Sequence, residues 1–380
     1  MLRASALLAT SDMFLMKPST FLSLYEKLER LVQRLPESLQ APILREITPI
    51  KTLFLLQRAP RIVLLGPGGT GKADIINSLF GVEIVRPGEE NLSDGAWQNF
   101  GRNSCGVLRL LDARRPGSIH LLKDAIAAEA PDLFIFARGT GEINETQELD
   151  QAVELVSFAK SRHSVRPRLL GLLLGDGDKD TERQRQDLHA ALHGRPELSD
   201  QMVGTLALDA GASAERLIQL IAYELPGEAQ LEMARLSGNR PLQKEIAQVV
   251  IKSATAMCGA IGAQPIPLAD FPILTSMQAT MVAGIMHISG REMSVKLGAQ
   301  FLAAVGANVG LGLALREGSR AAVKLVPIWG NAISGAVAAA GTYSVGRAAV
   351  AYFIEGVSMK GARGLFRRKR KEKKPLLTER

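Results

Sequence analysis

The chain has 380 residues, of which 46% are hydrophobic and 22% are charged. This composition excludes disordered and fibrous proteins, and the length predicts more than one domain because a single core rarely grows beyond about 250 residues. The formal net charge is +8, which points to an acidic partner, and the position of that charge decides which kind of partner it is.

The excess of positive charge lies at the C-terminal end. Residues 363–380 hold nine Lys or Arg and two Glu, which leaves 37 basic and 36 acidic residues for the rest of the chain. Aromatic residues, on which nucleic-acid bases could stack, make up only 5%. The charge therefore argues against nucleic acid as a partner and for a basic tail that faces an anionic membrane surface.

The first part of the chain is predicted to be helical. Apolar residues recur at helical spacing over 21–35, and a weaker apolar stretch follows at 43–56. These patterns predict an N-terminal helical segment over residues 1–58.

Short aliphatic runs alternate with helical stretches between residues 59 and 227. We predict strands at the following five runs: 61–65, 107–111, 133–137, 169–174 and 203–208. Such alternation is typical of an α/β domain with a mostly parallel sheet and crossover helices.

A glycine-rich segment directly follows the first predicted strand and opens a helical stretch. Its sequence, Gly66-Pro67-Gly68-Gly69-Thr70-Gly71-Lys72-Ala73, fits the P-loop pattern G-x-x-x-x-G-K, with Ala73 where Ser or Thr is usual. Glycines let backbone N–H groups surround a phosphate, the helix N-terminus adds partial positive charge, and the lysine reaches the outer phosphates. The residues predicted to bind nucleotide are Gly66, Gly68, Gly69, Thr70, Gly71, Lys72 and Ala73. An ordinary glycine-rich turn is the alternative.

The P-loop and the helix after it, residues 71–81, resemble those of Era-like GTPases, which often read GKSSLINALLG. Residues 131–137 are similar to the fourth strand of that G domain, and residues 209–226 to its last loop and closing helix. The resemblance implies a G-like domain over residues 59–227 that binds GTP and Mg²⁺. It also implies that Asp112 holds Mg²⁺ through water and that Asp178 reads the guanine base.

The motifs depart from the GTPase pattern at three places. Ala73 has no hydroxyl for Mg²⁺, which predicts weak metal binding. The D-x-x-G spacing after Asp112 is broken because the next glycine is Gly117, and Gly175-Asp176-Gly177-Asp178 replaces N-K-x-D. Slow hydrolysis is therefore expected, no catalytic residue is assigned, and the choice between guanine and adenine stays open.

After residue 227 the chain becomes rich in Ala and Gly. Four windows contain no Asp, Glu, Lys or Arg, namely 253–269, 271–290, 297–315 and 325–346. Each is close to the ~20 residues that a membrane-spanning helix needs, but 297–315 has only eight strongly apolar side chains in nineteen. A hydrophobic α-helical domain is predicted over 228–362, and a compact or membrane-peripheral bundle is favoured over spanning helices.

Residues 266–278 and 326–346 resemble the hydrophobic helical domain of unknown function that follows the G domain in YcjF-like bacterial proteins. The resemblances together imply a GTP-binding, nucleotide-dependent switch at the cytoplasmic face of the bacterial inner membrane, with slow or impaired hydrolysis. It would contact the membrane surface or bilayer through residues 253–346 and the basic tail, and a protein partner of unknown kind. The alternative is a non-enzymatic pseudo-GTPase scaffold or interaction protein.

Overall fold

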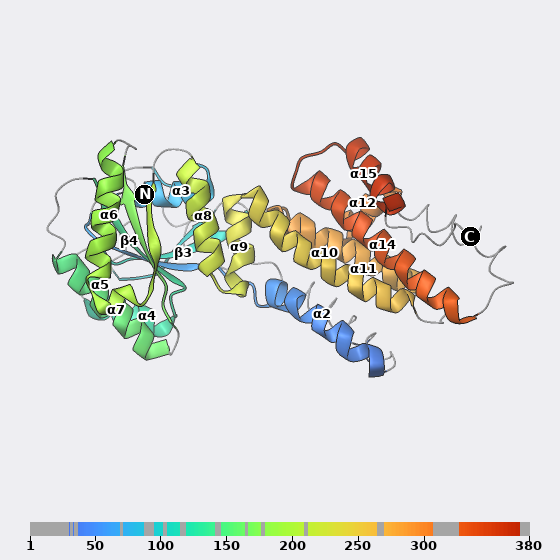
Figure 1. Cartoon of the computed structure of the whole chain (residues 1–380), viewed down its shortest axis with the longest axis horizontal. Helices are drawn as coiled ribbons and strands as arrows, with labels where there is room; N and C mark the ends of the chain where they lie inside the picture. The colour runs from blue at the N-terminus through green and yellow to red at the C-terminus, as the bar shows by residue number, and fades with distance from the viewer. Residues whose placement is uncertain are drawn as a thin grey trace, which may run out of the picture. The chain divides into compact units, whose positions relative to one another are not determined.

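The computed structural model describes residues 30, 33, 37–68, 71–86, 95–101, 105–114, 119–140, 146–163, 166–175, 179–208, 212–263, 270–306 and 327–372. In this part of the chain, Arg58–Asn239 forms one compact unit (Figure 1). The described residues from Arg30 to Gln57 form a second unit together with those from Arg240 onward. Most of the helix predicted over 21–35 lies outside the described residues.

The first unit is built on a six-stranded sheet. The strands are β1 (Arg61–Leu65), β2 (Gln98–Gly101), β3 (Val107–Asp112), β4 (Leu133–Gly139), β5 (Leu169–Leu174) and β6 (Met202–Leu208). Their order is β2-β3-β1-β4-β5-β6, and all pair in parallel except β2, which is antiparallel to β3. The five predicted strands are confirmed, as is the mostly parallel α/β fold.

Edge strand β2 is absent from the sequence prediction. It has only four residues, Gln-Asn-Phe-Gly, and they alternate between half-buried and exposed. A short edge strand pairs on one side only, so its sequence does not need the aliphatic run that marks a buried strand.

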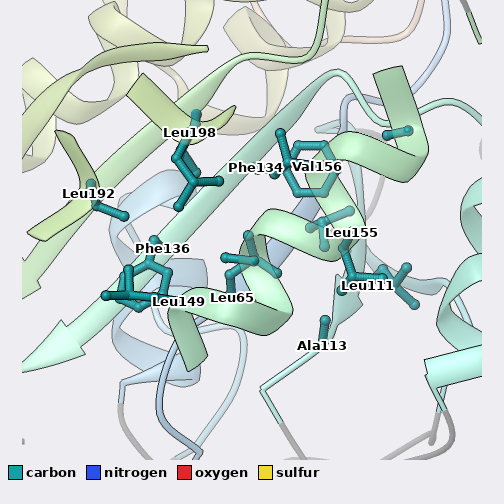
Figure 2. Packing of buried hydrophobic residues seen from close by; sticks show 14 of the residues in the cluster. Leu65, Leu111, Ala113, Phe134, Phe136, Leu149, Leu155, Val156, Leu192 and Leu198 are labelled. Atoms are coloured by element: carbon teal, nitrogen blue, oxygen red, sulfur yellow. The ribbon is translucent and has the colours of Figure 1, made fainter. Parts of the chain in front are cut away.

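Helices cover both faces of the sheet (Figure 1). They are α3 (Lys72–Phe80), α4 (Ile119–Ala128), α5 (Thr146–His163), α6 (Lys179–His193), α7 (Pro196–Ser199), α8 (Ala212–Glu224) and α9 (Gly227–Ser237). Figure 2 shows the core on one face, where Leu149 and Val156 of α5 pack against strand residues such as Leu65 and Phe136. The alternate residues of β1, Ile62 and Leu64, are buried on the other face. Burial on both faces explains why the central strands read as continuous aliphatic runs.

Helix α9 belongs to the first unit, although the predicted domain limit falls at residue 227. The buried Glu232 of α9 accepts a hydrogen bond of 2.8 Å from the backbone N–H of Val107, where β3 begins. It also pairs with Arg235 over 3.0 Å. A Cβ atom on Gly106 would lie 2.8 Å from the backbone nitrogen of Leu236. These contacts attach α9 to β3, so the unit ends at Asn239.

The second unit is entirely helical in the described residues. Its helices are α2 (Glu37–Leu55), α10 (Arg240–Gly262), α11 (Asp270–Ile288), α12 (Val295–Val305), α14 (Pro327–Phe353) and α15 (Met359–Glu372). Helix α2 packs against α10 and so belongs to this unit, whereas the sequence predicts a separate N-terminal segment. The predicted basic tail begins inside α15, and residues 373–380 lie outside the described residues.

Small residues form the contact between α10 and α14. A Cβ atom on Gly262 would lie 2.7 Å from the Cβ of Ala338, and one on Gly335 would lie 2.8 Å from the carbonyl oxygen of Gly259. Close packing of these two helices thus requires small residues at the contact. None of the described helices combines the length and apolarity that crossing a membrane requires.

Candidate nucleotide-binding site

The loop from β1 to α3 passes so close to its neighbours that a Cβ atom at any of three glycines would collide with another residue. A Cβ atom on Gly66 would lie 2.1 Å from the carbonyl oxygen of Ala137, and one on Gly71 would lie 2.0 Å from Leu174 Cδ1. At Gly68 it would lie 2.8 Å from the carbonyl oxygen of Arg114. Gly66 and Gly71 also have positive φ angles of 109° and 60°, which side-chain-bearing residues rarely adopt. Gly69 and Thr70 lie outside the described residues.

Lys72 is the first residue of α3, and its side chain is only 1% exposed. Its Nζ donates a hydrogen bond of 2.8 Å to Gln98 Oε1, lies 3.6 Å from Asp112 Oδ2 and sits 5.7 Å from the centre of the Phe100 ring. Gln98 and Phe100 come from β2, the strand that the sequence prediction lacks. A buried ammonium needs such partners because desolvation of an unpaired charge is costly.

Asp112 ends β3 and is held by Arg114, two residues further on. Arg114 Nε donates to Asp112 Oδ1 over 2.9 Å and Nη2 donates to Oδ2 over 3.1 Å, and the Arg114 side chain is 3% exposed. Burial tends to raise the pKa of Asp112, but the hydrogen bonds and charge of Arg114, together with the charge of Lys72, outweigh it and lower that pKa below its ordinary value. The carboxylate is therefore ionised at neutral pH and shared by two cations.

The sequence prediction includes Lys72 and Asp112 but lacks Arg114. The signal that could have found it is the D-x-R spacing at the place where a GTPase has D-x-x-G. Arginine two residues after a strand-ending aspartate can reach back to form a bidentate pair.

The residues of the loop fit a phosphate group. The backbone at Gly66, Gly68 and Gly71 carries no Cβ atoms that would block a phosphate from the N–H groups. Lys72 supplies an ammonium, and the N-terminus of α3 adds partial positive charge at the loop. They fit the usual Mg²⁺ ligand set poorly, because Ala73 is buried without a hydroxyl and both oxygens of Asp112 are engaged by Arg114. The geometry thus disfavours the predicted role of Asp112 as a partner of metal-bound water.

The base-binding end of the site lies mostly outside the described residues. Strand β5 ends at Leu174, and the N–H of Gly175 donates to the carbonyl oxygen of Leu208 over 3.3 Å. Asp178 belongs to the stretch 176–178 that the structure does not describe. Its guanine contact stays a prediction.

The fold and the loop define the first unit as a mostly parallel α/β domain in which a glycine-rich loop of the P-loop pattern joins β1 to α3. No family model matches the chain. Among solved structures, the chain is similar to Era in complex with MgGDPNP and nucleotides 1506–1542 of 16S ribosomal RNA. The match has a TM-score of 0.32 and 14% sequence identity, and covers 53% of this chain and 68% of that one.

We expect Asp112→Asn to destabilise the first unit by about 3 kcal/mol at neutral pH, because it takes a carboxylate away from the buried Arg114. A carboxyl group whose pKa is lowered by folding contributes stability above its unfolded pKa, near 3.8, and loses it as the pH falls through the lower folded value. The difference between wild type and variant should therefore shrink below pH 3.8. Urea unfolding from pH 3 to pH 7 measures it.

The exposed pair of Asp150 with Arg195 provides the control for this measurement. Asp150→Asn should change the unfolding free energy by less than about 1 kcal/mol at every pH. An Asp112→Asn effect that is independent of pH would contradict the assigned ion pair.

Proposed function

We propose that the first unit binds a nucleoside triphosphate, GTP by the resemblance of its P-loop, and acts as a nucleotide-dependent switch. The observation that supports this most directly is a loop in which a Cβ atom at any of three glycines would collide with a neighbour, combined with a buried lysine at the start of α3. Lys72, Arg114 and Asp112 together carry one net positive charge. A phosphate group bound at the loop would balance that charge.

Slow or impaired hydrolysis is part of the proposal. Phosphoryl transfer depends on a positioned metal ion and water, whereas Asp112 is held by Arg114 and Ala73 lacks the usual hydroxyl. A domain that binds nucleotide without turning it over would be a static scaffold, which is the alternative function.

Titration of the full-length chain with fluorescent GTP and ATP tests the proposal. We expect saturable binding with one site per chain, and competition between the unlabelled nucleotides decides which base is preferred. Absence of binding for both nucleotides would overturn the proposal. Binding of GTP without any release of phosphate in a single-turnover experiment would favour the scaffold over the switch.

We further propose that α15 holds the chain at an anionic membrane surface. Its Ala362 and Phe366 are buried in the second unit, while Lys360, Arg367 and Arg368 are exposed. Arg363 donates two hydrogen bonds, of 3.0 and 2.7 Å, to the carbonyl oxygen of Ala304, next to the end of α12. Since the apolar side of α15 is already packed, attachment would be electrostatic rather than by insertion.

Replacing Arg367, Arg368 and Lys369 with Gln is expected to weaken binding to vesicles that contain anionic lipid by about a hundredfold, because each basic residue near such a surface contributes about 1 kcal/mol. Binding of the wild-type chain should also fall as the salt concentration rises. Vesicle co-sedimentation of the full-length chain measures both effects.

A control variant removes the same charge elsewhere, with Gln at the exposed Arg183, Arg216 and Lys252. This variant should bind anionic vesicles nearly as well as wild type. Equal losses in the two variants, or equal binding of wild type to neutral vesicles, would contradict a specific role of α15.

A further inference from the structure

Arg114 is linked to the P-loop in two ways, directly through its backbone and indirectly through the carboxylate that its side chain binds. Its carbonyl oxygen comes so close to Gly68 that a Cβ atom there would be 2.8 Å away. Its buried guanidinium donates to both oxygens of Asp112, and Asp112 Oδ2 lies 3.6 Å from Lys72 Nζ. Two cations thus share one carboxylate next to the phosphate cradle.

The same arrangement closes the usual approach of a metal ion. A metal-bound water would need an acceptor site on Asp112. Its Oδ1 accepts hydrogen bonds from the backbone N–H of Arg114 over 3.3 Å and from the Arg114 Nε, while its Oδ2 accepts one from Nη2 and lies 3.6 Å from Lys72 Nζ. Freeing the carboxylate would take it away from a buried guanidinium, at a large desolvation cost. The hydroxyl that would complete the metal site is absent at Ala73.

We infer that this site binds its nucleotide without Mg²⁺, and that Arg114 is the residue that makes it metal-independent. The Arg114 guanidinium is hydrogen-bonded to the Asp112 carboxylate, which would otherwise contact a metal-bound water. It also keeps, together with Lys72, the positive charge that a metal ion supplies in other P-loop proteins. The inference rests on the proposed nucleotide-binding function and adds that the site needs no metal cofactor.

The first measurement compares the affinity of the full-length wild-type chain for fluorescent GTP and GDP in excess MgCl₂ and in excess EDTA. We expect the dissociation constants in the two buffers to agree within about threefold. Tightening by Mg²⁺ of tenfold or more would overturn the inference while leaving the proposed function intact. No binding in either buffer would overturn the proposed function, and this inference with it.

The second measurement restores the metal site. The double variant Ala73→Ser with Arg114→Gln supplies a hydroxyl and releases Asp112, so we expect Mg²⁺ to tighten its GTP binding by about tenfold or more. A folded double variant that stays insensitive to Mg²⁺ would show that Arg114 does not exclude the metal, and would overturn the inference. Circular dichroism establishes whether the variant folds, and the wild-type comparison decides the question if it does not.

Arg109→Gln is the matched control for Arg114. Both arginines flank or belong to β3, and both pair with a carboxylate, which for Arg109 is Glu129. Arg109 pairs in register with Arg61 at the start of β1, whereas the P-loop follows the end of that strand. Nucleotide binding by Arg109→Gln should remain insensitive to Mg²⁺, and a Mg²⁺ dependence as large as that of the double variant would refute a specific role of Arg114.

Discussion

Lys72→Met is expected to weaken GTP binding by about a hundredfold or more, since the loss of a charged hydrogen-bond donor costs about 3 kcal/mol. Methionine keeps most of the buried stem of the side chain and removes only the ammonium. Lys72 is 1% exposed, and its Nζ contacts Gln98 and Asp112. The ammonium is therefore already fixed in position beside the loop. Titration with fluorescent GTP, in MgCl₂ and in EDTA, measures the loss.

Lys123→Met is a close control for this variant. Lys123 also pairs with a carboxylate, Glu154, over 2.6 Å and also lies over an aromatic ring, that of Phe158, at 5.6 Å. It differs in belonging to α4 and in being 28% exposed, whereas Lys72 is 1% exposed. We expect it to bind GTP as wild type does, and a loss comparable to that of Lys72→Met would mean that Lys72 has no specific role in binding phosphate.

Gly66→Ala should destabilise the first unit by about 2 to 6 kcal/mol, because backbone strain and overpacking each cost about 1 to 3 kcal/mol. The φ angle of Gly66 is 109°, and a Cβ atom would lie 2.1 Å from the carbonyl oxygen of Ala137. That oxygen belongs to the backbone of β4, so a side-chain rotation cannot relieve the clash. Hydrogen exchange in peptides from β1 and β4 measures the local free energy of opening.

Gly204→Ala is a control that distinguishes the cost of backbone strain from the cost of a steric clash. Gly204 of β6 also has a positive φ, 149°, but a Cβ atom there would meet nothing within 4 Å. We expect this variant to lose only about 1 kcal/mol, from backbone strain alone. If both variants lose the same amount, the close approach of Gly66 to β4 does not limit the loop.

The sequence predicts most of the first unit because its signals are local. An aliphatic run marks a strand that is buried on both faces, and glycines followed by lysine mark a phosphate loop. Local patterns do not predict strand β2 or the role of Arg114, for different reasons. The four residues of β2 form a strand only because β3 lies beside them, and Arg114 matters only because its side chain turns back to Asp112.

The limits of the units were harder to predict. A change in composition at residue 227 marks the start of the Ala- and Gly-rich part of the chain, but α9 stays with the first unit through the hydrogen bond of Glu232 to Val107. The charge-free windows could be read as spanning helices or as a bundle, since both bury apolar residues. The packing of Gly262 against Ala338 accounts for small residues that apolarity alone does not explain.

The sequence by itself determined five of the six strands, the place of the glycine-rich loop between β1 and α3 and the position of the excess positive charge. These follow from side-chain patterns over a few neighbouring residues. Only the tertiary structure decided that Lys72 is paired with Gln98 and Asp112, and that Arg114 occupies the carboxylate a metal ion would use. Pairing between distant residues depends on which strands and loops come together at one end of the sheet. A pattern of a few neighbouring residues does not predict this arrangement.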